Sequence, residues 1–311
     1  MKKDILTLMD LERDDFEHLF RRAVALKKSR RAGTDEMPLR GKSLGLIFEK
    51  PSTRTRLSFE AAMVQLGGTP MFISARDLQM VRDEPVKDTA RVLSRYLDGL
   101  AIRTFSQELV EEFAGYSTIP VINALTDRYH PIQVLSDLMT VLESKPDLAK
   151  QKIAWVGDGN NVAHSWINAA AVLGLDLHLA CPEGYLPDRD ILDAARGRGG
   201  RITMDADPAD AVNGADVIYT DVWASMGQEE ESEKRRRIFA PYQVNAALVA
   251  LAAKDVIVMH CLPAHRGEEI TEDVLEGPQS VAWDQAENKL HMHKAVLEQL
   301  LGGSEAGMLG G

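Results

Sequence analysis

Long hydrophobic runs are missing from this sequence, and no stretch approaches the ~18 consecutive apolar residues that a membrane-spanning helix needs. The N-terminal segment begins with two lysines after Met1, but acidic residues soon interrupt its apolar positions, so it does not match a secretory signal peptide. Only two cysteines, Cys181 and Cys261, are present. Two cysteines provide no disulfide framework, and this scarcity favours a reducing, cytoplasmic environment.

An excess of basic residues is also missing. The chain has 36 Lys and Arg against 47 Asp and Glu, which gives a formal net charge of −11. An acidic chain is poorly suited to a nucleic-acid backbone, so we expect no nucleic-acid partner. Any anionic ligand must instead be bound by a local basic pocket that works against the overall field.

Short β-rich segments alternate with longer helical segments along all 311 residues, without an internal repeat. Several of the β-rich segments are almost continuously apolar, which is typical of strands buried on both faces. The alternation and the length predict an α/β fold with two open, mainly parallel-sheet domains joined by interdomain helices. The predicted strands are 43–49, 70–75, 99–104, 120–124, 152–158, 176–182, 201–206, 216–222, 255–262 and 280–285.

The domain boundary is expected after the long helix that begins at His130. The segment KPDLAKQK breaks the helical pattern, and a new strand begins at Lys152. We therefore expect one domain over residues 1–147 and a second over 148–286. Residues 287–311 are expected to form a C-terminal helix followed by a flexible glycine-rich tail.

The segment FEKPSTRTRLSFE, residues 48–60, concentrates hydroxyl and guanidinium groups between a strand and a helix. Ser52 stands where an N-cap residue would stand, and a helix N-terminus with hydroxyl donors and an arginine suits a phosphate. Arg54 and Arg56 point about 200° apart on a helix, so only one can face the same ligand. We assign Arg54 to the ligand and Arg56 to a structural pairing. The spacing alone favours equally a capped helix with solvated arginines.

Two other motifs resemble cofactor or metal sites. In WVGDGNNVAHSW, Gly157 and Gly159 follow a strand, but Val162 stands at the third glycine position and Asp158 would repel a pyrophosphate. We therefore reject a dinucleotide site.

In HCLPAH, His260, Cys261 and His265 are all metal-ligand types. However, adjacent residues on an extended strand point to opposite faces, and the paired spacing of zinc sites is missing. We therefore expect no metal ligand set and no cofactor.

STRTR resembles the carbamoyl-phosphate signature of the aspartate/ornithine carbamoyltransferase family. Further segments resemble the same family in the same order, and the last three resemble its ornithine branch. These segments are DEPVKDTARVLSRYLDGLAIRTF (83–105), HPIQ (130–133), DGNN (158–161), DVWASMG (221–227) and HCLPAHRGEEI (260–270).

The resemblance implies a carbamoyl-phosphate-binding domain over 1–147, an ornithine-binding domain over 148–286 and a C-terminal helix that packs back towards the first domain. It also implies a homotrimer without a metal or organic cofactor. The implied reaction transfers the carbamoyl group of carbamoyl phosphate to the δ-amine of L-ornithine, giving L-citrulline and phosphate, in arginine biosynthesis.

Two alternatives remain open. One is carbamoyl transfer to another amine, putrescine or acetylated ornithine, although putrescine has no α-amino group for Asp221 to bind. The other is a non-catalytic anion-binding regulator. The presence of Arg54, Arg103, His130 and Cys261 together with Asp221 counts against a silent regulator.

For carbamoyl phosphate, the resemblance implies phosphate contacts by the STRT residues and a trans contact by a loop glutamine of a neighbouring subunit. It implies carbonyl contacts by Thr55, Arg103 and His130, and a contact of Gln133 with the carbamoyl nitrogen. Lys289 stands where the family usually has arginine. The implied contacts are Ser52, Thr53, Arg54, Thr55, Gln79 (in trans), Arg103, His130, Gln133, Cys261, the main chain of Leu262, and Lys289.

For ornithine, the resemblance implies that Asn161 binds the α-carboxylate end, whereas Asp221, Ser225 and the main chain of Met226 bind the amino end. Cys261 is implied to lie beside the reacting amine. With Asp221 it would favour the neutral amine, which is necessary because such an amine has a reference pKa near ~10. The implied catalytic residues are Arg103, His130, Asp221 and Cys261.

Overall fold

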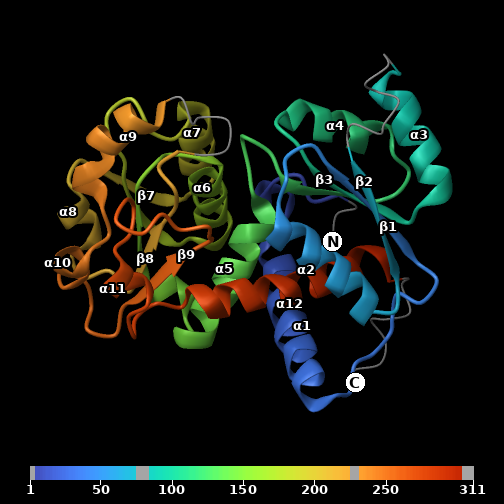
Figure 1. Cartoon of the computed structure of the whole chain (residues 1–311), viewed down its shortest axis with the longest axis horizontal. Coiled ribbons are helices and arrows are strands. Elements are labelled where there is room, and N and C mark those ends of the chain that lie inside the picture. The colour runs from blue at the N-terminus through green and yellow to red at the C-terminus, as the bar shows by residue number, and fades with distance from the viewer. Residues whose placement is uncertain (1–3, 75–83, 225–230, 303–311) are drawn as a thin grey trace. The chain divides into compact units, whose positions relative to one another are not determined.

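The computed structural model describes residues 4–74, 84–224 and 231–302, which belong to two compact units (Figure 1). The first unit comprises Met1–Ser136 and Asn288–Gly311, and the second comprises Asp137–Glu287. The units therefore divide within a helix, whereas the boundary expected from the sequence falls after it. The C-terminal helix belongs from residue 288 onward to the first unit, and the predicted flexible tail lies outside the described residues.

The first unit is a four-stranded parallel sheet with strand order β2-β1-β3-β4. Helices α3 and α4 cover one face, where Ala90, Val110 and Phe113 pack on Ile47 and Ile102 of the strands. Its elements are η1 (Leu8–Asp10), α1 (Arg13–Ala32), β1 (Ser43–Phe48), α2 (Thr53–Gln65), β2 (Thr69–Ser74), α3 (Val86–Tyr96), β3 (Gly99–Arg103), α4 (Gln107–Tyr116) and β4 (Val121–Leu125).

The second unit is a five-stranded parallel sheet with strand order β7-β6-β5-β8-β9. One face packs against α8 and α11 through small and β-branched side chains such as Ala154, Val156 and Ile218. Its elements are η4 (Leu148–Lys150), β5 (Lys152–Val156), α6 (Asn161–Leu173), β6 (Asp176–Ala180), α7 (Arg189–Gly197), β7 (Arg201–Asp205), α8 (Pro208–Val212), β8 (Val217–Thr220), α9 (Ser232–Phe239), η6 (Ala240–Tyr242), α10 (Ala246–Val249), β9 (Ile257–His260) and α11 (Glu272–Leu275).

Two further helices contribute residues to both units, α5 (Pro131–Ser144) and α12 (Ala282–Leu301). The predicted α/β fold of two parallel-sheet domains with interdomain helices is therefore confirmed. Among the described residues, none of the helices combines the length and the apolar character that crossing a membrane would require.

The predicted strand over 280–285 is wrong. Ser280 forms only an isolated bridge with Val258, and α12 begins at Ala282. The burial pattern explains the difference, because Ala282 and Gln285 are buried whereas Trp283 is 54% exposed. A spacing of three residues between buried positions matches a helix, not the alternation of a strand.

Both sheets present polar residues at the carboxyl ends of their strands, where open α/β sheets bind ligands. In the first unit Ser52 follows β1 and Arg103 ends β3. In the second unit the strand order reverses between β5 and β8. Asn160 follows β5, and Asp221 follows β8 directly.

Gly159 lies in the turn between β5 and α6, where the chain passes close to another backbone segment. Its N–H donates to the carbonyl of Tyr185 at 2.9 Å. A Cβ at this position would lie 2.3 Å from the nitrogen of Pro187 and 2.5 Å from the carbonyl carbon of Leu186. The glycine of this motif is therefore required for close backbone packing.

Gly159→Ala should destabilise the protein by about 2 kcal/mol or more, because backbone atoms must move to admit the methyl group. Gly197→Ala is the matched control, since Gly197 is an exposed residue of α7 with open space around its Cβ position. The control should be neutral or stabilising by up to about 1 kcal/mol. Urea denaturation of both variants measures the difference, and equal midpoints would contradict the packing argument.

Candidate active site

The N-terminus of α2 carries the STRTR motif. Ser52 has an extended conformation and caps the helix, since its Oγ accepts the N–H of Thr55 at 3.3 Å. Thr53 and Arg54 are exposed in the first turn, whereas Thr55 is buried. The predicted N-cap is therefore confirmed, and Arg54 stands beside the positive end of the helix dipole.

Arg56 has a different environment from Arg54. Its Nε lies 2.9 Å from Oε1 of Glu60, and its guanidinium carbon lies 3.6 Å from the ring centroid of Phe72. These contacts join α2 to β2, so the predicted structural pairing of Arg56 is confirmed.

Lys289 brings three helices of the first unit together. Its buried ammonium donates to Oγ1 of Thr55 at 3.1 Å and to Oε1 of Gln133 at 2.8 Å. These three residues come from α12, α2 and α5, and all three were predicted from the sequence to contact carbamoyl phosphate. The structure therefore places them in one cluster.

His130 and Arg103 lie at the carboxyl ends of β4 and β3. A turn precedes His130, in which the Thr126 N–H donates to the Tyr129 carbonyl at 2.9 Å and the Tyr129 N–H donates to Thr126 Oγ1 at 3.0 Å. Pro131 then opens α5, a position that proline favours because its missing N–H would be unpaired there. His130 and Arg103 are both buried.

Burial lowers the pKa of His130 well below its ordinary value, and the positive charges of Lys289 and Arg103 lower the pKa further. His130 is therefore a neutral imidazole at neutral pH. A neutral imidazole can donate one N–H to a carbonyl oxygen without adding charge, while the neighbouring cations supply the field for an anion.

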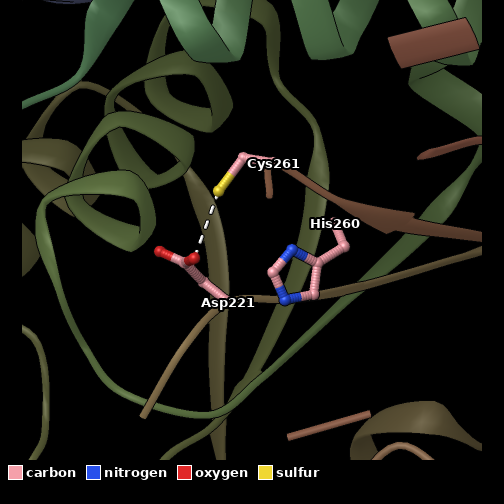
Figure 2. Close-up of side chains that lie close together, drawn as sticks. All are labelled: Asp221, His260 and Cys261. Carbon is pink, nitrogen blue, oxygen red and sulfur yellow. Dashed lines mark hydrogen bonds between the residues drawn. The ribbon is translucent and has the colours of Figure 1, made fainter. Parts of the chain in front are cut away.

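Asp221, Cys261 and His260 lie close together in the second unit (Figure 2). The Cys261 thiol donates to Oδ1 of Asp221 at 3.1 Å, and the N–H of Val222 donates to the same oxygen at 2.8 Å. The side-chain amide of Asn160 donates to Oδ2 at 2.8 Å. The two predicted catalytic residues of this unit, Asp221 and Cys261, are therefore in direct contact.

Asn160 was not predicted from the sequence, which singled out its neighbour Asn161. Asn160 is the N-cap of α6, and its Oδ1 accepts the N–H groups of Val162 and Ala163. This capping leaves the amide NH₂ to donate to Asp221. The N-cap preference of asparagine could have distinguished the roles of Asn160 and Asn161, because the asparagine that comes first after the strand is the natural cap of the helix. Asn161 is the first residue of the helix.

Asp158, in the same motif, forms a buried ion pair with Arg235. The guanidinium Nη1 lies 2.8 Å from Oδ2 of Asp158 and donates to the carbonyl of Trp223 at 2.7 Å. Burial raises the pKa of Asp158 to about 6, against the opposing effect of Arg235. This carboxylate therefore anchors α9 to the turn after β5, a role that the sequence did not indicate.

The expectation that His260 and Cys261 point to opposite faces is wrong. Ligand atoms of Asp221, His260 and Cys261 lie within 4.8 Å of one another (Figure 2). The alternation fails because β9 ends at His260 and Leu262 takes a left-handed conformation with φ 60°.

Both ring nitrogens of His260 already have hydrogen-bond partners. Nδ1 accepts the N–H of Leu262 at 2.9 Å, and Nε2 lies 2.9 Å from Oε1 of Glu269. A metal ion bound by this cluster would have to break one of these bonds.

A second cluster of ligand types comprises His265, Glu268 and Glu269. In this cluster Arg236 lies 2.8 Å from a carboxylate oxygen of Glu268. Its positive charge opposes the binding of a cation.

Three predicted contacts, Gln79, Ser225 and Met226, lie outside the described residues.

The first unit thus has a cation-rich cluster that includes Arg103 and Lys289, and the second unit has a carboxylate–thiol pair, Asp221 and Cys261. These features define a two-unit α/β protein with two polar sites. Comparison with known families agrees with this description. The family model "Aspartate/ornithine carbamoyltransferase, carbamoyl-P binding domain" matches residues 3–143. The model "Aspartate/ornithine carbamoyltransferase, Asp/Orn binding domain" matches residues 149–300. The chain belongs to the aspartate/ornithine carbamoyltransferase family.

Individual relatives match over almost the whole chain. A protein of Desulfotalea psychrophila named ornithine carbamoyltransferase is 61% identical over 303 residues, which are 97% of this chain and 100% of the relative. The solved structure of ornithine carbamoyltransferase from Pyrococcus furiosus is 51% identical with a TM-score of 0.93, covering 96% of this chain and 97% of that one. The enzyme of the same name from Thermus thermophilus is 42% identical with a TM-score of 0.87, covering 97% and 99%.

The buried histidines His130 and His293 should make the protein sensitive to acid. His293 stacks on Phe59 with ring centroids 3.7 Å apart, and burial and Lys289 lower its pKa well below the ordinary value. Because both pKa values are lower in the folded than in the unfolded chain, the unfolded chain binds more protons below about pH 6.5. Stability should therefore fall as the pH drops through that value.

His293→Phe keeps an aromatic ring on Phe59 but removes the titrating group. The slope of unfolding free energy against pH between 7 and 5 should become shallower by up to about 1.4 kcal/mol per pH unit. His18→Gln, on the exposed face of α1, is the control and should leave the slope unchanged. Urea titrations across this range measure the slope, and identical slopes for wild type and His293→Phe would refute the argument.

Proposed function

We propose that this chain transfers the carbamoyl group of carbamoyl phosphate to the δ-amine of L-ornithine, giving L-citrulline and phosphate. The observation that carries the proposal is the hydrogen bond between Cys261 and Asp221, in a chain whose full-length relatives are named ornithine carbamoyltransferases. The thiol and the carboxylate follow the adjacent strands β9 and β8 of the second unit. The residues proposed to bind the phosphate, Ser52 to Thr55, belong to the first unit.

In the first unit, the exposed N-terminus of α2 supports phosphate binding by Ser52, Thr53, Arg54 and Thr55. The carbonyl oxygen is assigned to Arg103, His130 and Thr55, and the carbamoyl nitrogen to Gln133. Lys289 supplies a positive charge that is already held by Thr55 and Gln133. Donors fixed in this way stabilise the negative charge that develops on the carbonyl oxygen during attack.

In the second unit, Asp221 is proposed to accept the α-amino group of ornithine. A carboxylate offers about four acceptor positions, and the contacts of Asn160, Val222 and Cys261 use three of them. Among the contacts made by the described residues, a fourth position is left for the substrate ammonium. Asn161, at the N-terminus of α6, is proposed to bind the α-carboxylate, where the helix dipole favours an anion.

The chemical step is an attack by the neutral δ-amine on the carbonyl carbon. A C–N bond forms, a tetrahedral intermediate collapses, and the C–O bond to phosphate breaks. The proton lost from nitrogen leaves with the phosphate. Cys261, next to Asp221, is proposed to lie beside the amine and, with the main chain of Leu262, to orient the carbamoyl group.

We further propose a homotrimer in which Gln79 contacts the site of a neighbouring subunit, with Ser225 and Met226 completing the ornithine site. β2 is an edge strand of its sheet and leads directly into the segment that contains Gln79. Both α2 and β2 carry exposed apolar side chains, which a subunit interface would bury. They are Leu57, Val64, Met71 and Phe72. The proposed setting is arginine biosynthesis in the cytoplasm.

A citrulline-formation assay with a panel of amines tests the function. L-Ornithine should give citrulline, whereas putrescine should react at least about a hundredfold more slowly, because it leaves Asp221 and Asn161 without substrate partners. Nα-acetylornithine should also be poor, since it lacks a charged α-amino group. A preference for putrescine or acetylornithine would reassign the acceptor, and no product with any amine would favour the anion-binding regulator.

Arg54→Ala should weaken carbamoyl-phosphate binding by on the order of tenfold to a hundredfold, because it removes a charge-assisted contact to the phosphate. Arg56→Ala is the matched control on the same helix. Its contacts with Glu60 and Phe72 predict a loss of stability with little change in affinity. Calorimetric titration of both variants with carbamoyl phosphate measures the difference, and equal losses of affinity would overturn the assignment of the two arginines.

A further inference from the structure

Asp137 lies fully buried in the second unit and accepts hydrogen bonds from two neutral donors. The Tyr219 hydroxyl donates to Oδ2 at 2.8 Å, and the side-chain amide of Gln285 donates to Oδ1 at 2.8 Å. The same amide lies 3.0 Å from the Tyr219 hydroxyl oxygen. All three side chains are at most 1% exposed. We call these three residues the Asp137 network.

The Asp137 network contacts the strand ends that carry Asp221 and Cys261. Tyr219 lies on β8, and Asp221 follows it two residues later, directly after the end of the strand. Oε1 of Gln285 accepts the main-chain N–H of His260 at 3.0 Å, and His260 directly precedes Cys261. Strands β8 and β9 pair Thr220 with His260 at the same level. The Asp137 carboxylate therefore holds the backbone on both sides of the Cys261–Asp221 hydrogen bond.

The ring of Tyr219 is fixed independently of its hydroxyl group. It stacks on Trp155 with centroids 5.1 Å apart and meets Trp166 edge-on at 5.6 Å. Burial and the nearby carboxylate of Asp137 raise the pKa of Tyr219 well above its ordinary value, so the hydroxyl remains a donor. A substitution that removes only this oxygen therefore leaves the ring packing intact.

We propose that Asp137 is a positioning residue for the Asp221–Cys261 pair and acts through Tyr219 and Gln285. It touches neither proposed substrate. Its effect is to fix the ends of β8 and β9, so that the thiol sulfur and the carboxylate oxygen stay at hydrogen-bond distance. The kinetic part of this inference rests on the proposed function, whereas the geometric part does not.

Tyr219→Phe tests the kinetic part. The value of kcat/KM for ornithine should fall about tenfold, while the Kd of carbamoyl phosphate should change less than about twofold. Tyr242→Phe is the matched control, because the Tyr242 hydroxyl donates to the carbonyl of Ala206 at 3.3 Å on the surface of the same unit, away from the Asp137 network. The control should leave both values unchanged. A Tyr219→Phe enzyme with wild-type kcat/KM would overturn the proposal.

The rate at which iodoacetamide labels Cys261 tests the geometric part without any assay of activity. Loosening the thiol from Asp221 removes a negative charge from its surroundings, so labelling should become several-fold faster in Tyr219→Phe and in Asp137→Asn. Buried Cys181, read from its own peptide by mass spectrometry, reports global opening and should stay protected. Faster labelling of both cysteines, or of neither, would refute a local positioning role.

Failure of the proposed function and failure of the positioning role give different results. If the wild-type protein forms no citrulline, the proposed function fails, yet the labelling rates still decide whether Asp137 orders the pair. If the wild type forms citrulline and the variants match it in kcat/KM and labelling, only the positioning role fails. Should Tyr219→Phe not fold, Asp137→Asn carries both measurements, because it preserves the side-chain volume.

Discussion

A buried ammonium group needs hydrogen-bond acceptors, and the arrangement of three helices in the first unit depends on the acceptors that Lys289 has. Removing such a charge from water is costly unless hydrogen bonds replace the lost hydration. Thr55 and Gln133 provide these bonds, so α2 and α5 are fixed against α12 at the level of the STRTR motif. The point charge of a lysine needs no planar partner, so a hydroxyl and an amide oxygen suffice. Two hydrogen bonds of one ammonium group therefore join three helices beside the proposed phosphate site.

The same charge determines the state of His130. An imidazole that was buried among acids would take up a proton, but here Lys289 and Arg103 act together with burial to keep it neutral. The first unit can thus hold two cations and a neutral donor close together without a third positive charge. Such a set fits a ligand that combines a dianionic phosphate with an uncharged carbonyl group, because the two parts need different partners.

Local patterns were sufficient to predict most of the fold. Apolar runs identified the nine strands named here, and capping signals placed Ser52 before α2. They failed at 280–285, where a short apolar segment fits both periods. The burial of Ala282 and Gln285, with Trp283 and Asp284 exposed between them, distinguishes the helix from a strand. The pattern also failed at His260 and Cys261, since strand alternation holds only while the strand continues, and β9 ends between them.

What the sequence could not indicate is any contact that joins distant residues without a local signal. Asp137 and Gln285 are separated by 148 positions. By itself Asp137 reads as an ordinary polar residue of a helix, and Gln285 reads as the last residue of a strand. Their burial is explained by the three-residue network with Tyr219, because a buried carboxylate needs donors on both oxygens, and Gln285 and Tyr219 supply one each. Helix α5 supplies Gln133 to the first unit and Asp137 to the second, while α12 supplies Lys289 and Gln285 in the same way. Both helices thus bear residues that order a proposed substrate site in each unit.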